Sequence, residues 1–146
     1  LLFYTVSYGI SPLLSFYILL TISNKAGTET LDGFRGLSHR HPLLTGLIVV
    51  SMLSLAGIPP TAGFFAKYFV FTTALDAGYT GLVLIAVVGS LIGVYYYFRP
   101  IMAVFGAEQE GHSVELPGST TWLLVLMALF SIVLGIYPGL LSGLAL

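Results

Sequence analysis

The side chain best suited to chemistry in this sequence is Lys67, which stands inside the apolar run GFFAKYF at residues 63–69. If this run is helical, Lys67 lies about 12 Å from the helix end near Leu75, at about 1.5 Å per residue. Helical side chains lean toward the helix N-terminus, so the ammonium is aimed back into the apolar segment. Apolar surroundings disfavour a charged ammonium, so a lysine placed here can exchange a proton. We therefore predict that Lys67 is a proton relay.

Two plainer interpretations of Lys67 stay open at this point. A lysine can lay its hydrocarbon stem along apolar surface and carry its ammonium to the water. It can also belong to a purely structural module, where its charge neutralises a neighbouring group. An ionisable group inside apolar segments is a functional candidate by default, which favours the relay. Substitution of Lys67 by alanine separates these interpretations, because it should abolish proton movement only if Lys67 is a relay.

A helix break is predicted directly before this lysine. Residues 57–63 read GIPPTAG, and the two adjacent prolines remove two backbone donors from any helix. Glycine at both ends allows backbone angles that other residues resist. We expect two half-helices, at about residues 43–56 and 61–75, joined by a turn that lies inside protein or beside a water-filled cavity. The predicted site therefore consists of Lys67 and the break residues Gly57, Pro59, Pro60, Thr61 and Gly63.

The elements that must position this site are membrane helices. Hydrophobic residues make up 57% of the chain and charged residues 8%, whereas about a quarter of a soluble domain is charged. Since about 20 mostly apolar residues span a bilayer, we predict an all-α integral membrane protein in which a single domain contributes four transmembrane helices. The helices are expected at about residues 1–22, 43–75 with the break between Gly57 and Thr61, 81–98 and 121–137, with polar loops at 24–41 and 99–119.

The broken segment is expected to cross the membrane once. One crossing places every basic residue except Lys67 on the same face, namely Lys25, Arg35, Arg40 and Arg99. If the segment doubled back, Arg99 would move to the opposite face. Basic residues near segment ends prefer the cytoplasmic side, which favours the single crossing. The loop at residues 24–41 fits either a short helix lying on the membrane surface or an ordinary solvated loop.

Several other kinds of site are not expected. The chain has no cysteine, which excludes disulfides, iron–sulfur ligation and thiolate zinc sites on it. His39 and His41 are two residues apart and do not share a helical face, so no metal site is predicted. The net charge is −1 without a basic stripe, so nucleic acid is not an expected partner. Leu1 already lies in an apolar run without a basic region before it, which predicts a piece of a longer polytopic protein rather than a signal peptide.

Three motifs carry a resemblance to a known family. They are LDGFRGL at residues 31–37, MLSLAGIPPTAGFFAKY at residues 52–68 and YYYFR at residues 95–99. Together they resemble the antiporter-like subunits of respiratory complex I, and the second motif is long and specific. Within that group the chain is most similar to subunit N, because subunit M usually has a glutamate where this chain has Lys67.

The resemblance implies the last four helices of a fourteen-helix fold, with Lys67 as the lysine of the outer half-channel. It implies a non-redox subunit that translocates protons in an NADH–quinone oxidoreductase, in an energy-converting membrane such as the bacterial inner membrane. NADH, FMN, the iron–sulfur clusters and quinone would sit on other subunits, so no cofactor is expected on this chain. The partners would be other membrane-arm subunits, the lipid bilayer, protons and internal water. The alternative is a subunit of a cation/proton antiporter of the same fold.

Overall fold

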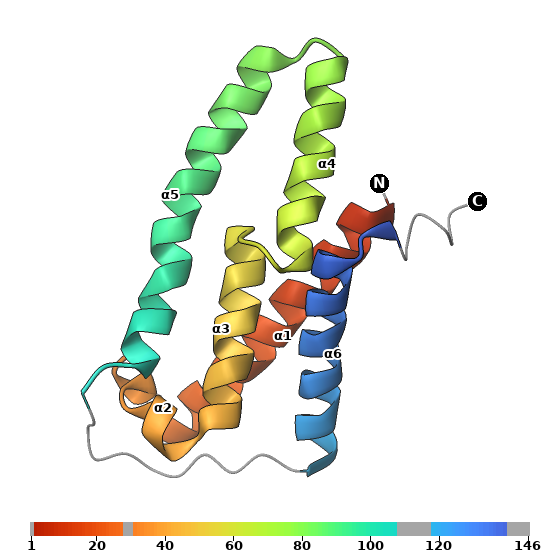
Figure 1. Cartoon of the computed structure of the whole chain (residues 1–146). Coiled ribbons are helices and arrows are strands. Elements are labelled where there is room, and N and C mark those ends of the chain that lie inside the picture. Colours follow the sequence, from red (N-terminus) through yellow and green to blue (C-terminus); the bar gives the residue numbers. More distant parts are fainter. Residues whose placement is uncertain (1, 28–30, 108–117, 140–146) are drawn as a thin grey trace.

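A computed structural model describes residues 2–27, 31–107 and 118–139 of the chain. The described residues form helices and no strand, which confirms the all-helical prediction (Figure 1). In chain order the elements are α1 (Leu2–Ala26), the 3₁₀ helix η1 (Leu31–Phe34), α2 (Leu37–Arg40), α3 (Pro42–Ala56), α4 (Ala62–Asp76), α5 (Thr80–Val104) and α6 (Gly118–Ile136).

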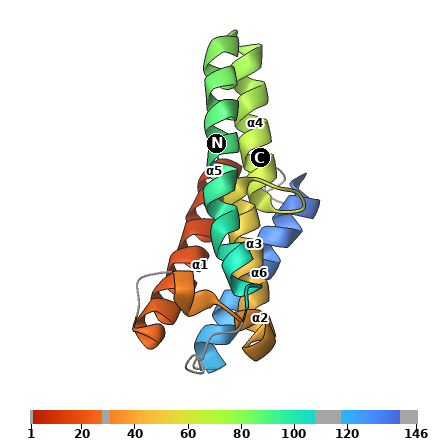
Figure 2. The same cartoon turned by 90° about the vertical axis from the view of Figure 1, so that its left-hand side faces the viewer.

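The helix α3 lies at the centre of the molecule, in contact with α1, α4, α5 and α6. The apolar core forms around it, from side chains such as Ile18 of α1, Ile48 of α3 and Leu124 of α6. The helices α4 and α5 continue beyond this core as an antiparallel pair, which both side views show (Figures 1 and 2). The first turn of α4 therefore lies at the edge of the core, beside the last turn of α3.

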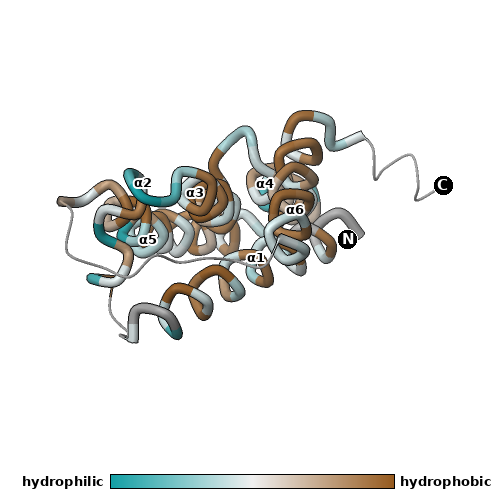
Figure 3. The backbone as a smooth tube through the Cα atoms, turned by 90° about the horizontal axis from the view of Figure 1, so that it is seen from below, coloured by the Kyte–Doolittle hydropathy of each residue, from teal (hydrophilic) through white to brown (hydrophobic). Residues whose placement is uncertain are grey.

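Hydrophilic residues gather at one end of the molecule. η1 and α2 lie at the same end as the C-terminus of α5, and the turn at residues 77–79 lies at the opposite end (Figure 1). Figure 3 shows hydrophilic residues gathered around α2, whereas α3 and α6 are mostly apolar. In the view of Figure 1, α3 and α4 run in the same direction, with the start of α4 beside the end of α3.

Two helices of the described part of the chain, α5 and α6, are long and apolar enough to cross a membrane. The apolar helix α3 has 15 residues, which is too short to cross a membrane by itself. The outer face of α5 presents large apolar side chains, with Ile85 75% exposed and Leu91 66% exposed. Such a surface suits lipid or neighbouring helices better than water.

Several predicted boundaries are wrong. α5 was expected to end near Phe98, yet it continues through Pro100 to Val104. α1 extends to Ala26 instead of ending near residue 22, and η1 and α2 form in the segment 24–41, where a short helix was one of the two alternatives. α5 continues past the helix-breaking signal of Pro100 because packing outweighs it, since Val104 is buried in the core. Residues 28–30 and 108–117 of the two predicted loops lie outside the described residues.

Candidate functional site

The site is built on the last turn of α3, which ends in a glycine with left-handed backbone angles. Gly57 has φ 77° and ψ 43°, and its N–H donates to the Ser54 carbonyl at 3.1 Å. The N–H of Ile58 donates to the Leu53 carbonyl at 3.0 Å. This pair of bonds is the Schellman arrangement that commonly closes a helix. It satisfies two of the four carbonyls that a helix end leaves without an intrahelical donor.

Lys67 satisfies the other two carbonyls. Its Nζ donates to the Ala56 carbonyl oxygen at 2.9 Å and lies 3.4 Å from that of Leu55. The half-buried side chain reaches back from α4 to the end of α3, in the direction that the lean of helical side chains predicts. The C-terminus of a helix carries partial negative charge, so it is a favourable place for an ammonium.

Glycine is required at position 57 for two reasons, the space that the Lys67 side chain needs and the positive φ angle of the backbone. A Cβ added at this position would lie 2.8 Å from the Lys67 Cδ and 3.1 Å from its Nζ. The positive φ disfavours any residue with a side chain independently of that contact. The same glycine thus ends α3 and leaves the space that the lysine side chain fills.

Two further glycines bring the backbones of three helices together at the break. A Cβ at Gly63 of α4 would collide with the Ser54 carbonyl of α3. A Cβ at Gly135 of α6 would collide with the Pro60 carbonyl in the break itself. Gly63 was among the predicted site residues, whereas Gly135 was not, because nothing in its local sequence indicates which backbone it faces.

The remaining break residues divide between surface and interior. Pro59 and Pro60 lie in the turn after Gly57 and are exposed, so they do not line the interior. Thr61 is buried and takes extended backbone angles just before α4. Its Oγ1 donates to the Ile58 carbonyl at 2.7 Å, which closes the turn between the helices.

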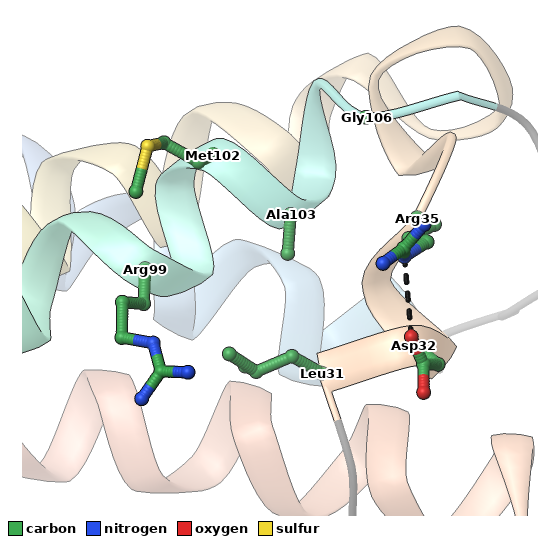
Figure 4. A pocket seen from close by; sticks show the side chains of 7 residues that line it. All are labelled: Leu31, Asp32, Arg35, Arg99, Met102, Ala103 and Gly106. Atoms are coloured by element: carbon green, nitrogen blue, oxygen red, sulfur yellow. Dashed lines mark ion pairs between the residues drawn. The ribbon is translucent and has the colours of Figure 1, made fainter.

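Arg35 and Arg99 line a surface cleft of about 690 Å³ at the opposite end of α3. Figure 4 shows Arg35 and Arg99 in this cleft, on different elements. The Arg35 Nε pairs with Asp32 at 3.1 Å, and both side chains are about half exposed. Arg99 lies against the Tyr95 ring, with 6.0 Å between its Cζ and the ring centroid. Lys67 is therefore far from Arg35, Arg99 and Asp32, which lie at the other end of α3.

The arrangement at the break can hold an ammonium without a counter-ion. Within the described residues the hydrogen-bond acceptors of Lys67 are two neutral backbone carbonyls, those of Ala56 and Leu55. A lysine held by carbonyl dipoles can lose its proton without leaving an unpaired carboxylate behind. His39 and His41 lie near α2, at the other end of α3, and the described residues hold no group of potential metal ligands.

Comparisons with known proteins give the same family as the motifs. The NADH:quinone oxidoreductase/Mrp antiporter transmembrane family matches residues 1–93. The NADH-quinone oxidoreductase subunit N of Cytophaga hutchinsonii is 39% identical over 140 residues, covering 94% of this chain. That of Flavobacterium johnsoniae is 38% identical over 140 residues, covering 96% of this chain. The chain spans 30% of the length of each of these relatives.

Solved structures share the fold. A chain of respiratory complex I from Thermus thermophilus superposes with a TM-score of 0.82 at 34% identity, covering 94% of this chain and 32% of that one. A chain of the Mrp complex from a Dietzia species superposes with a TM-score of 0.80 at 21% identity, covering 95% of this chain and 34% of that one. The resemblance of the motifs is confirmed, and the chain belongs to the NADH:quinone oxidoreductase/Mrp antiporter transmembrane family.

Proposed function

We propose that the chain is part of a proton-translocating membrane subunit of an NADH–quinone oxidoreductase, in which Lys67 relays protons at a broken transmembrane helix. The observation that carries the proposal is the Lys67 ammonium bound to the Ala56 and Leu55 carbonyls at the end of α3. The subunit N relatives and the likeness to a complex I chain support the choice of enzyme.

The proposed topology has four crossings, by α1, by α3 and α4 together, by α5 and by α6. α1 has 25 residues, a length of about 37 Å at 1.5 Å per residue, which exceeds an apolar core of about 30 Å. In this topology α3 and α4, which run in the same direction (Figure 1), form one broken segment. The break then falls within the membrane, where irregular backbone is tolerated only inside protein or beside water.

In this function Lys67 alternates between its charged and neutral forms. The two carbonyls favour the ammonium, and the apolar surroundings favour the neutral amine. A small change in the local field can therefore move the proton on to internal water. The chain contributes no redox centre, and NADH, FMN, iron–sulfur clusters and quinone belong to partner subunits. The bacterial relatives point to the bacterial inner membrane as the location.

A second candidate is a subunit of a cation/proton antiporter, which the likeness to the Mrp complex favours at the level of the fold. In that case Lys67 would exchange its proton in step with a cation. The two candidates differ in their partners, because an oxidoreductase assembly purifies with flavin and iron–sulfur signals and an antiporter does not.

The proposal is tested by replacing Lys67 in the full-length protein within its complex. Proton pumping and NADH oxidation are measured in membranes and normalised to assembled complex. Lys67→Ala should abolish pumping. Lys67→His should retain part of it, because imidazole has a usual pKa of about 6.5 and can still exchange protons. Full pumping in Lys67→Ala would remove this residue from the mechanism.

A further inference from the structure

Three buried serines meet beside the break, one from each of three helices. They are Ser11 of α1, Ser54 of α3 and Ser131 of α6, with exposed fractions of 3%, 3% and 2%. The hydroxyl oxygens of Ser11 and Ser54 are 2.6 Å apart, and the Ser131 hydroxyl donates to that of Ser54 at 3.2 Å. Ser54 is the shared member, so we call this group the serine junction.

The junction differs from the ordinary behaviour of serine in a helix. A helical serine can satisfy its hydroxyl on a carbonyl of its own helix. Ser15 does so on Ser11 at 2.9 Å, and Ser51 does so on Ile48 at 2.9 Å. Ser54 instead bonds to two other helices, so its hydroxyl ties α3 to α1 and α6.

Ser54 lies in the turn of α3 that holds Lys67. Its own carbonyl accepts the Gly57 N–H and lies against Gly63, and the next two carbonyls along the chain bind the ammonium. α6 reaches the same region twice, through Ser131 and one turn later through Gly135. A shift of the last turn of α3 would therefore move the Lys67 acceptors directly.

We propose that Ser54, held by Ser11 and Ser131, is a positioning residue that keeps the Leu55 and Ala56 carbonyls aimed at Lys67. The inference rests on the proposed role of Lys67 in proton transport. Without the junction the last turn of α3 keeps its Schellman bonds but loses its tie to α1 and α6. The Leu55 and Ala56 carbonyls then no longer hold the ammonium in one position. As a result, fewer protons are moved for each NADH oxidised.

The test compares two serines of α3 in the full-length protein within its complex. Ser54→Ala removes both interhelical bonds, whereas Ser51→Ala removes an equally buried hydroxyl that bonds only within α3. We expect Ser54→Ala to lower the ratio of protons pumped to NADH oxidised by about 2- to 12-fold, the factor that a hydrogen bond contributes. Ser51→Ala should leave the ratio unchanged, and Ser54→Thr, which keeps a hydroxyl, should restore most of it.

Two further measurements separate this inference from a structural role and from the proposed function. Ser11→Ala removes the shorter bond without touching α3, so it tests the junction if Ser54→Ala does not assemble. A lower amount of complex with an unchanged ratio in both variants would overturn the positioning role. If Lys67→Ala abolishes pumping while both serine variants pump normally, the inference fails and the proposed function stands. Full pumping in Lys67→Ala would overturn both.

Discussion

Lys67 at the break and the two arginines of the surface cleft are held by different kinds of groups. Lys67 binds neutral backbone carbonyls at a helix end, whereas Arg35 pairs with a carboxylate and Arg99 lies on a tyrosine ring. The arginines cannot release their charge in a protein, and they stand at the polar end of the molecule. Lys67 can release its proton and stands where the helices meet. On the proposed function, the arginines set orientation in the membrane, whereas the charge of Lys67 changes during transport.

Exchanging the two kinds of cation should give the largest effect. Lys67→Arg keeps a charge at the break that cannot be released, so proton pumping should fall at least about a hundredfold, in line with the contribution of a positioned proton-transfer group. Arg99→Lys makes the reverse change at the cleft and should leave pumping within about twofold, because an exposed charge there serves only orientation. Pumping per assembled complex is the measurement. Full activity in Lys67→Arg would reduce Lys67 to a fixed counter-charge.

The next largest effect should come from the close backbone contacts at the break. Gly135→Ala places a methyl group against the Pro60 carbonyl, which is backbone and cannot rotate away, so the amount of assembled complex should fall severely. Gly89→Ala is the matched control, because a Cβ at this helical glycine meets nothing within 4 Å. Quantitative immunoblotting of membranes compares the two variants. Equal assembly would show that α6 does not approach the break as closely as described.

A smaller effect is expected at the glycine that both ends α3 and makes room for Lys67. Gly57→Ala and Gly78→Ala impose a similar backbone penalty of about 1–2 kcal/mol, since their φ angles are 77° and 84°. They differ in space, because a Cβ at Gly57 meets the Lys67 side chain and one at Gly78 meets nothing within 4 Å. Both variants should lose similar thermal stability, but only Gly57→Ala should also lose pumping per assembled complex. Equal pumping in the two variants would contradict the fit of Lys67 against Gly57.

The smallest effect is expected at the cleft. Asp32→Asn removes the partner of Arg35, and an exposed ion pair contributes about 0–1 kcal/mol. Thermal stability should change little, and pumping should not change, because the pair lies away from the break. A loss of pumping comparable to that of Lys67→Ala would show that the cleft takes part in transport, and the contrast between the two regions would then fail.

Much of the site could be predicted because its signals are local. Pro59 and Pro60 remove donors wherever they stand, so a break between α3 and α4 follows from two adjacent residues. The inward direction of Lys67 follows from the geometry of a helix. The extension of α5 to Val104 could not be predicted in the same way, because burial of Val104 in the core, and not a local signal, keeps this segment helical.

By itself the sequence determined an all-helical chain, a break next to a single inward lysine and a glycine at that break. Only the tertiary structure decided that Lys67 binds the Ala56 carbonyl, that Gly135 faces Pro60 and that the serine junction forms. The physical reason is the range of the interactions. A proline or a helical lean acts within a few residues, whereas Ser54 and Ser131 are 77 residues apart and meet only after α1, α3 and α6 have packed.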